Sequence, residues 1–294
     1  MHCPCGRDTV DTLNAKAMNH TRRQLVTALG VGAAVPLLGW AAPARAASPQ
    51  RMALVIGNAS YKVGALKNPV NDAKAIAGSL RGLGFDVTHR ENASLRDMLD
   101  AFQQFSIRSQ SAEVRVVYYA GHGVQVKGRN YLLPVDTDIR AEEEMPSKSA
   151  DLNAFLDRLG DLKHGINVVI LDACRNNPFS GQPIVGPDGR ALKYRGATPA
   201  GLAPVEAPLG SFVAFSTAPG GVALDNPQDR NSLYTKHLLE HLPSPGLPVE
   251  LLFKRVRLAV AKETGRVQVP WESSSLTGDF CFRTMAGGAC SGVR

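Results

Sequence analysis

The chain has 294 residues, of which 44% are hydrophobic and 20% are charged, a balance that fits a globular domain with a buried core and little disorder. This composition excludes a collagen, a coiled coil and a small disulfide-dense scaffold. The formal charge is +7, but Arg22, Arg23 and Arg45 lie in a segment that we expect to be removed, which leaves +4 for residues 47–294. So mild an excess gives no reason to predict a nucleic-acid partner, which needs a clustered basic face.

Residues 18–46 have the three parts of an export signal: a basic start at Arg22-Arg23, a weakly hydrophobic middle that contains glycine and proline, and a small-residue cleavage site at 44–46. Paired arginines before such a middle favour the twin-arginine route, which carries folded proteins across a membrane. The apolar run is shorter than the stretch of about 20 residues that spans a bilayer. We therefore expect a periplasmic or secreted protein without a stable membrane span after cleavage, with an uncleaved anchor as the alternative.

Residues 1–17 precede the basic pair as an upstream extension that an export signal does not need, so Met1 and Met18 are both candidate starts. One histidine and two cysteines in this extension lack the second pair of ligands that a zinc site requires. We predict no metal site there.

Beyond the signal, short apolar runs alternate with segments whose apolar residues recur at helical spacing. Ser94 with Asp97 three residues later predicts a capping box, and Asn71 is expected to cap the preceding helix. A turn at 127–130 between two short apolar segments predicts a hairpin. The strands are expected over 52–56, 85–88, 114–120, 166–171 and 211–216, and the helices over 71–84, 94–105, 152–162, 233–242 and 249–264.

This alternation of strands and helices predicts an α/β fold with a mostly parallel sheet, because right-handed crossovers place the helices on both faces. A long stretch rich in glycine and proline, 180–210, separates the fourth strand from the fifth. Ligands of such sheets bind beyond the carboxyl ends of the strands. The residues that follow each strand are therefore where we expect the chemistry.

A histidine and a cysteine follow the third and the fourth predicted strands, in Gly121-His122-Gly123 and in Asp172-Ala173-Cys174. If these strands are neighbours, about 4.8 Å apart, an imidazole and a thiol meet at one edge of the sheet. The thiolate is a nucleophile whose proton the histidine can take, and the backbone N–H groups of Gly123 and Cys174 can bind an oxyanion. The plainer alternative is a small core cysteine and a structural loop histidine.

These two motifs, about 50 residues apart, resemble those of the caspase-like cysteine peptidases, in particular the bacterial metacaspase branch. The resemblance implies that His122 and Cys174 form a catalytic dyad that hydrolyses peptide bonds through an acyl-enzyme. It also implies a caspase-like domain over 47–283, with a sheet of about six strands flanked by helices on both faces, and a tail over 284–294. The likeness extends from about 51 to 283 and includes 71–73, 216–220 and 270–272.

Metacaspases cleave after Arg or Lys by means of acidic residues in the specificity pocket, and the matching positions here are Asp72 and Asp172. A partly enclosed pair of carboxylates is costly until a cation arrives, which favours a basic side chain. The alternatives are that Asp72 stabilises a helix start through its dipole and that Asp172 is hydrogen-bonded within a loop. The resemblance further implies protein or peptide substrates with a basic P1 residue and a monomeric enzyme.

The chain departs from that family in some places. Ala120 stands where many metacaspases have serine, and 175–177 reads Arg-Asn-Asn where the eukaryotic branch commonly has His-Ser-Gly. Many metacaspases need calcium, for which Asp136, Asp138 and the run 142–144 offer oxygen ligands. Such an acidic run is most often a solvated face, and a thiol peptidase requires no metal or other cofactor.

Basic residues in the stretch 180–210 make it a candidate self-processing loop, since the expected enzyme cleaves after basic residues. These residues are Arg190, Lys193 and Arg195. An uncut linker is the alternative. Further along the chain, Trp271 is expected in the core or in a pocket wall rather than as a platform for a ligand.

Removal of the leader leaves three cysteines, an odd number that suggests one pair and one free thiol in an oxidising compartment. Cys281 and Cys290 either close a small loop or remain two free thiols. If Cys281 lies on the last strand, a disulfide there could protect the edge of the sheet.

The sequence therefore predicts an exported, caspase-like cysteine endopeptidase that acts after Arg or Lys. A rival from a different class is a catalytically silent caspase-fold module that binds peptides or partners in the cell envelope, although the presence of both His122 and Cys174 argues against it. A nucleotide-binding domain is disfavoured because 57–60 lacks the glycine spacing of a phosphate loop.

Overall fold

The computed structural model describes residues 50–162, 164–174, 184–185, 191–192, 202–219, 223, 228–286, 288 and 290, with the backbone alone at 174, 184–185 and 191–192. The expected signal and upstream extension lie outside these residues. By its internal contacts the chain divides into residues 1–46 and residues 47–294. Within the described part, no helix is both long and apolar enough to cross a membrane.

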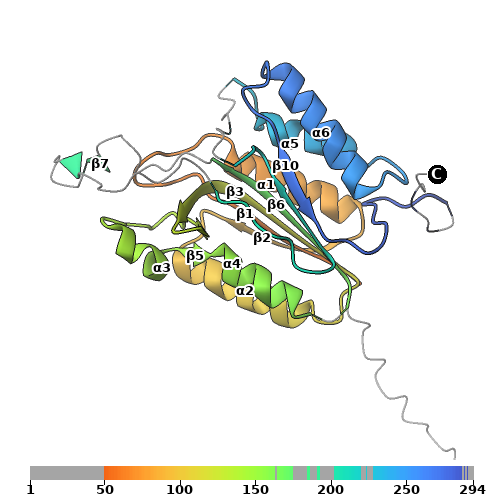
Figure 1. Cartoon of the computed structure of the whole chain (residues 1–294), viewed down its shortest axis with the longest axis horizontal. Helices are drawn as coiled ribbons and strands as arrows, with labels where there is room; N and C mark the ends of the chain where they lie inside the picture. The colour runs from red at the N-terminus through yellow and green to blue at the C-terminus, as the bar shows by residue number, and fades with distance from the viewer. Residues whose placement is uncertain are drawn as a thin grey trace, which may run out of the picture. The chain divides into compact units, whose positions relative to one another are not determined.

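One mixed sheet runs through the second of these units (Figure 1). Its neighbouring strands are parallel, except that β10 is antiparallel to β9. The predicted α/β fold with a mostly parallel sheet is confirmed. The strands are β1 (Arg51–Gly57), β2 (Asp86–Glu91), β3 (Val114–Val126), β6 (Ile166–Cys174), β9 (Ser211–Phe215) and β10 (Trp271–Ser274), in the spatial order β10-β9-β6-β3-β1-β2.

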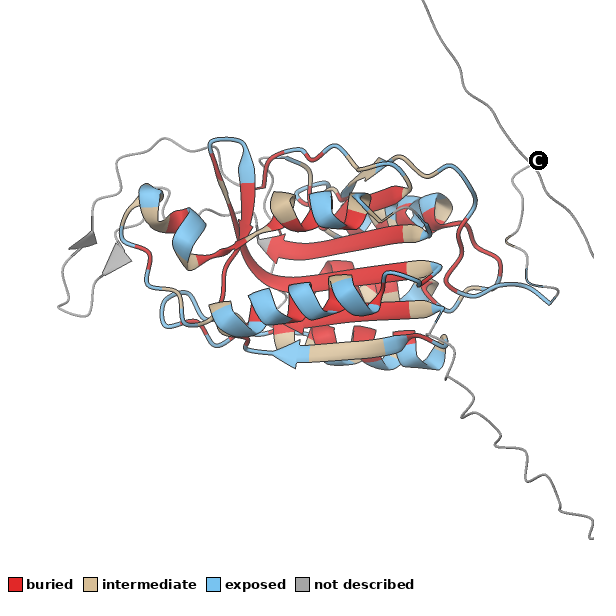
Figure 2. Ribbon diagram, turned by 90° about the horizontal axis from the view of Figure 1, so that it is seen from below, coloured by how far each residue is buried: buried red, intermediate tan, exposed pale blue. Residues whose placement is uncertain are grey.

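Helices cover both faces of the sheet, and each face has its own apolar core. The central strands are buried on both sides, as the red ribbons of Figure 2 show, which explains why they are continuous apolar runs rather than alternating ones. One face carries α1 (Pro69–Gly82), α5 (Leu233–His241) and α6 (Val249–Glu263), and the other carries α2 (Leu95–Arg108) and α4 (Leu152–Gly160).

Beyond the sheet, β3 continues into a hairpin with β4 (Arg129–Leu132). Lys127 and Gly128 form its two-residue turn with φ of 50° and 81°, the left-handed values that a type I′ turn requires. The predicted hairpin is confirmed. The smaller elements are β5 (Ala150–Asp151), which pairs with β4, the short helices η1 (Glu142–Glu144) and α3 (Met145–Lys148), and an antiparallel pair, β7 (Ile184–Val185) with β8 (Ala191–Leu192), inside the predicted loop.

Of the two helix caps predicted from the sequence, one is confirmed and one is wrong. Ser94 Oγ accepts from the N–H of Asp97, and the Asp97 carboxylate accepts from the N–H of Ser94, both at 3.2 Å, so the capping box is confirmed. The expected cap of α1 at Asn71 is wrong, because the helix begins three residues earlier, after Asn68. Pro69 occupies its first turn, where the fixed φ of proline suits a helix start.

The strand β10 was not expected, because its four residues are mostly polar and too few to show a pattern. Trp271 at its start is 49% exposed, so it does not lie in the core, and of the two places expected for it only a pocket wall stays a prediction. Cys281 and Cys290 are joined in a disulfide, with their Cα atoms 5.7 Å apart. Cys281 lies beyond β10 rather than on it, so this disulfide does not protect the strand edge in the way that we hypothesised.

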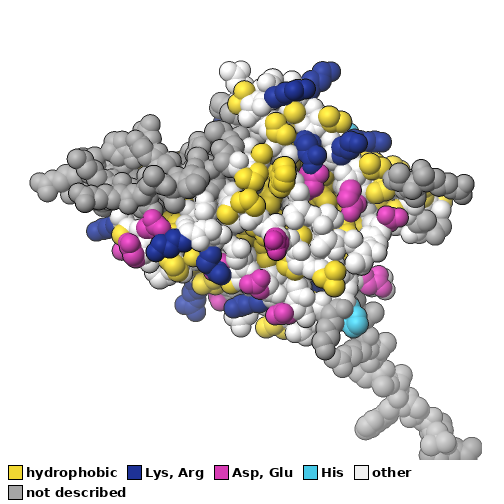
Figure 3. Space-filling model, viewed as in Figure 1, with side chains coloured by type: hydrophobic (Ala, Val, Ile, Leu, Met, Phe, Trp, Pro, Cys, Tyr) yellow, Lys and Arg dark blue, Asp and Glu magenta, His cyan; other side chains and the backbone are white. Residues whose placement is uncertain are grey.

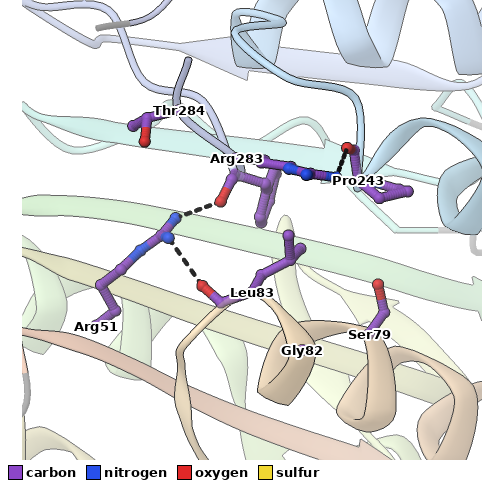
Figure 4. Close-up of a pocket in the computed structure, with 8 residues that line it drawn as sticks. Arg51, Ser79, Gly82, Leu83, Pro243, Arg283 and Thr284 are labelled. Carbon is purple, nitrogen blue, oxygen red and sulfur yellow. Dashed lines mark hydrogen bonds between the residues drawn. The ribbon is translucent and has the colours of Figure 1, made fainter. Parts of the chain in front are cut away.

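A hollow of about 570 Å³ lies at the amino end of β1, the end of the sheet opposite the one where ligands are expected (Figure 4). Arg51 crosses it and donates to the carbonyl oxygens of Leu83, at 2.9 Å, and of Phe282, at 2.7 Å. Its guanidinium also lies 4.3 Å from the ring centroid of Phe85. The cation thus ties the C-terminal segment to the first strand, a structural role.

We expect Ser94→Ala to lower the free energy of unfolding by about 1 kcal/mol, because the first turn of α2 loses an acceptor for one of its unpaired N–H groups. Urea denaturation measures this change. Ser94→Thr, which keeps the hydroxyl, should stay close to the wild type. Equal stability of Ser94→Ala and the wild type would show that the Ser94 hydroxyl contributes nothing to the helix start.

Candidate active site

The pairing of β3 with β6 places the two chemistry-bearing residues opposite each other. The register of this parallel pair aligns Ala120 with Asp172 and His122 with Cys174. Adjacent strands lie about 4.8 Å apart, so the Cys174 backbone is the immediate neighbour of His122 across the ladder. Both residues lie within strand ends rather than in the loops where the sequence placed them, since β3 and β6 are longer than expected.

The loop after β1 fixes the orientation of the His122 imidazole. His122 is 9% exposed as a residue. Its Nε2 lies 2.6 Å from the carbonyl oxygen of Gly64, and its ring centroid lies 4.4 Å from that of the Tyr61 ring. Because a carbonyl oxygen only accepts hydrogen bonds, Nε2 must carry the proton. In the neutral imidazole the basic nitrogen is then Nδ1.

Two tyrosine hydroxyls hold the backbone of His122. Its N–H donates to Tyr61 Oη at 2.9 Å, and Tyr119 Oη donates to its carbonyl oxygen at 2.8 Å. Gly121 makes this approach possible, since a Cβ there would lie 2.5 Å from Tyr61 Oη and 2.7 Å from Tyr119 Oη. The glycine before the histidine is thus required by the packing of the tyrosines.

Sequence reasoning missed Tyr61 and Gly64. An available signal was their place in the loop after the first strand, at the carboxyl edge of the sheet. Gly64 has a φ of 72°, a left-handed conformation that glycine adopts without strain. An aromatic residue and a glycine in such a loop are reasonable candidates for contact with a site.

The β3–β4 hairpin does not use the N–H of Gly123. In the β3–β4 hairpin the carbonyl oxygen of His122 accepts from the N–H of Leu133, and bonded pairs alternate with non-bonded ones along an antiparallel ladder. The pair of Gly123 with Leu132 is therefore a non-bonded one. The N–H of Gly123 points away from β4 and toward β6, the other neighbour of β3, and its oxyanion role stays a prediction.

The structure brings Asp72 and Asp172 to a common partner, Ser232. The N–H of Ser232 donates to Asp72 Oδ1 at 3.0 Å, and its hydroxyl donates to Asp172 Oδ2. Asn231 Nδ2 donates to Asp72 Oδ1 at 2.8 Å, and Thr235 Oγ1 donates to Asp172 Oδ2 at 2.8 Å. Two acidic side chains from α1 and β6 thus converge on the start of α5, beside the strand end that carries the cysteine.

Ser232 also caps α5, because its hydroxyl accepts from the N–H of Thr235 at 3.0 Å. The sequence analysis did not single out Asn231, Ser232 or Thr235. A serine before a helical segment is an ordinary capping signal, and nothing in its spacing connects it with residues 60 and 160 positions away.

Three of the acidic residues considered for calcium have partners within the protein. Asp136 accepts from the N–H of Leu95 at 3.0 Å, Asp138 pairs with Arg140, and Glu144 pairs with Lys148. Across the described ranges, no three His, Cys, Asp or Glu side chains are grouped as a metal site would require. That the enzyme requires no metal stays a prediction, with calcium dependence as its alternative.

Two predicted features, the processing loop and one departure from the family, lie outside the described residues. Arg190, Lys193 and Arg195 of the candidate processing loop, and the departure at 175–177, are outside them. On the face drawn in Figure 3, basic and acidic side chains are interspersed rather than gathered into one basic patch.

Comparisons with known proteins identify the family. The family model of the caspase domain matches residues 50–281, most of the chain, so this protein belongs to the caspase domain family. The match supports a caspase-like cysteine peptidase and does not distinguish its branches.

Two curated proteins and a solved structure are similar to parts of this chain. A stretch of 126 residues, 42% of the chain, is 30% identical to the mouse mucosa-associated lymphoid tissue lymphoma translocation protein 1 homolog and 29% identical to its human counterpart, and it spans 15% of each of those proteins. The crystal structure of caspase-1 from Spodoptera frugiperda superposes with a TM-score of 0.58 over 82% of this chain and 92% of that one, at 19% identity. This likeness confirms the caspase-like fold.

We expect Gly64→Ala to reduce kcat/KM about tenfold or more for any substrate that the site turns over. The new Cβ would lie 3.3 Å from His122 Nε2, at a φ that side chains rarely adopt, so the carbonyl would lose its hold on the imidazole. Steady-state kinetics measure the effect.

Gly128→Ala is the matched control. Its φ of 81° imposes a similar backbone strain, but nothing lies within 4 Å of the added Cβ. If the two variants lose activity equally, backbone strain rather than the His122 contact explains the loss.

Proposed function

We propose that this protein is a cysteine endopeptidase of the metacaspase type, which hydrolyses peptide bonds after Arg or Lys. The observation that carries the proposal is the convergence of Asp72 and Asp172 on Ser232, next to the end of β6. A peptidase that accepts acidic residues would need cationic side chains in this place. Two carboxylates there favour guanidinium or ammonium groups instead.

The dyad supplies the bond-breaking chemistry. In the proposed reaction the Cys174 thiol gives its proton to His122 Nδ1, and the thiolate attacks the scissile carbonyl carbon. A C–S bond forms, the C–N bond breaks, and the imidazolium returns the proton to the departing amine. Water then hydrolyses the thioester with the histidine as base, and the N–H groups of Gly123 and Cys174 stabilise each oxyanion.

The acidic pocket supplies the selectivity. A buried carboxylate without a partner is expensive, and two of them repel each other. The four donors from the start of α5 offset part of this cost and keep both groups in place. A P1 cation would be attracted to these two charges, whereas an aspartate in P1 would add a third negative charge.

Hydrolysis of matched peptides with Arg, Lys, Asp or Ala in P1 tests the proposal. We expect cleavage after Arg and Lys to exceed cleavage after Ala by about a hundredfold, the size expected for a charge-assisted contact, and no cleavage after Asp. Parallel assays with calcium and with a chelator decide the metal question.

Two variants serve as controls for this assay. Cys174→Ala should abolish turnover, and Asp172→Asn should remove most of the preference for basic P1 residues because it keeps the shape and loses the charge. Cleavage that survives in Cys174→Ala, or a preference that survives in Asp172→Asn, contradicts the assignment. Absence of turnover with every peptide favours the silent binding module instead.

We also propose that residues 18–46 direct export through the twin-arginine route. The disulfide between Cys281 and Cys290 supports this proposal, because structural disulfides persist mainly in oxidising compartments. The twin-arginine route carries folded proteins, and in this proposal the disulfide closes after export, in the oxidising compartment.

Replacing Arg22 and Arg23 together by lysine should block export and leave the unprocessed precursor in the cytoplasm of a bacterium that has the route. The wild type should appear in the periplasm or medium with a new N-terminus near residue 47, as N-terminal sequencing would show. Unchanged export of the double variant, or a wild type that keeps its leader in the membrane fraction, contradicts the proposal.

A further inference from the structure

A buried chain of hydroxyl groups connects the middle of β3 with the acidic pocket. Tyr118 Oη lies 2.6 Å from Thr235 Oγ1, which in turn donates to Asp172 Oδ2 at 2.8 Å. Tyr118 and Thr235 are completely buried, and Asp172 is nearly so. These hydrogen-bonded hydroxyl groups, which we call the hydroxyl relay, therefore lie in the core between the sheet and α5. They reach Asp172 from the core side of the pocket.

The direction of these hydrogen bonds follows from the chemistry of the groups. An ionised carboxylate only accepts, so the single hydroxyl proton of Thr235 must point at Asp172. Thr235 Oγ1 can then only accept from Tyr118, which is the donor at the start of the chain. Burial, with the charges of Asp172 and Asp72 next, raises the pKa of Tyr118 well above its ordinary value, so the phenol keeps the proton that it donates.

We infer that Tyr118 and Thr235 are specificity-determining positioning residues that hold Asp172 ionised and in one orientation for the P1 cation. This inference rests on the proposed cleavage after Arg or Lys. Two neighbouring carboxylates that share Ser232 repel each other, and the uptake of a proton by one of them would relieve this repulsion. A pocket protonated in this way no longer prefers a cation. Donors aimed at Asp172 Oδ2 stabilise the charged form and oppose this protonation.

The effect of the hydroxyl relay can be distinguished from an effect of core packing, because α5 carries a tyrosine that matches Tyr118 but is not hydrogen-bonded to the relay. Tyr234 precedes Thr235 and is also completely buried, and its hydroxyl has no hydrogen-bond partner among the residues that the structure describes. Tyr234→Phe thus removes the same group from the same core without touching the relay. Thr235→Val removes the hydroxyl but keeps the shape, whereas Thr235→Ser keeps the hydroxyl and loses a methyl group.

The experiment compares these variants on peptides with Arg or citrulline in P1, since citrulline has nearly the shape of arginine without the charge. For the Arg peptide we expect Thr235→Val to raise KM about tenfold with kcat changed by less than about twofold, because a hydrogen bond to a charged group is lost. Tyr118→Phe, which acts through Thr235, should raise KM about threefold. Both variants should reduce the preference for Arg over citrulline, while Thr235→Ser and Tyr234→Phe should behave as the wild type.

Affinity measurements keep the test independent of turnover and of stability. In a Cys174→Ala background, calorimetry should show that Thr235→Val weakens the affinity for the Arg peptide most and Tyr118→Phe less. Thr235→Ser and Tyr234→Phe should leave this affinity unchanged. The double variant Tyr118→Phe/Thr235→Val leaves no orphaned hydroxyl and serves if Thr235→Val alone folds poorly.

Several outcomes overturn the inference. If Thr235→Val and Tyr118→Phe change only the melting temperature, or alter KM and affinity no more than Tyr234→Phe does, the relay is structural. If Thr235→Ser fails to restore KM, the hydroxyl is not what matters. A wild type that neither cleaves nor binds Arg and Lys peptides overturns the proposed function itself, and with it this inference.

Discussion

The parallel pairing of β3 with β6 is the constraint on which the site depends. One register aligns His122 with Cys174 and, two residues earlier, Ala120 with Asp172. A slip by one residue would turn every side chain of one strand to the opposite face of the sheet. The buried apolar runs of both strands oppose such a slip, because they fill two cores at once. The register of the two strands, rather than the conformation of a loop, thus sets the relative positions of these residues.

The second condition is that segments far apart in sequence close around those strand ends. The loop after β1 brings Tyr61 and Gly64 to His122, and the start of α5 brings Ser232 and Thr235 to the acidic residues. The first contact selects the tautomer of the imidazole, and the second organises the negative charge. In the proposed mechanism, catalysis and selectivity therefore have separate supports, and some variants should alter KM without altering kcat.

Much of the fold could be predicted from the sequence because its signals are local. Continuous apolar runs predicted the buried strands, and Ser94 with Asp97 predicted a capping box. Local signals failed where tertiary packing decides. Trp271 is hydrophobic yet exposed, and β10 forms because it pairs with β9 rather than through its own composition. Ser232 reads as an ordinary helix cap, and only the folded chain shows that it joins two acidic side chains from distant positions.

Covalent trapping tests the central claim most directly: that a thiol nucleophile at Cys174 lies beside a pocket for a basic side chain. The protein is incubated with a peptidyl chloromethyl ketone that carries Arg in P1 and with a matched one that carries Asp, and the modified residue is located by mass spectrometry. We predict one adduct, on Cys174, that forms with the Arg reagent, slows in the presence of an Arg peptide, and is absent with the Asp reagent. Labelling by both reagents at equal rates, or labelling of a residue other than Cys174, would contradict the account.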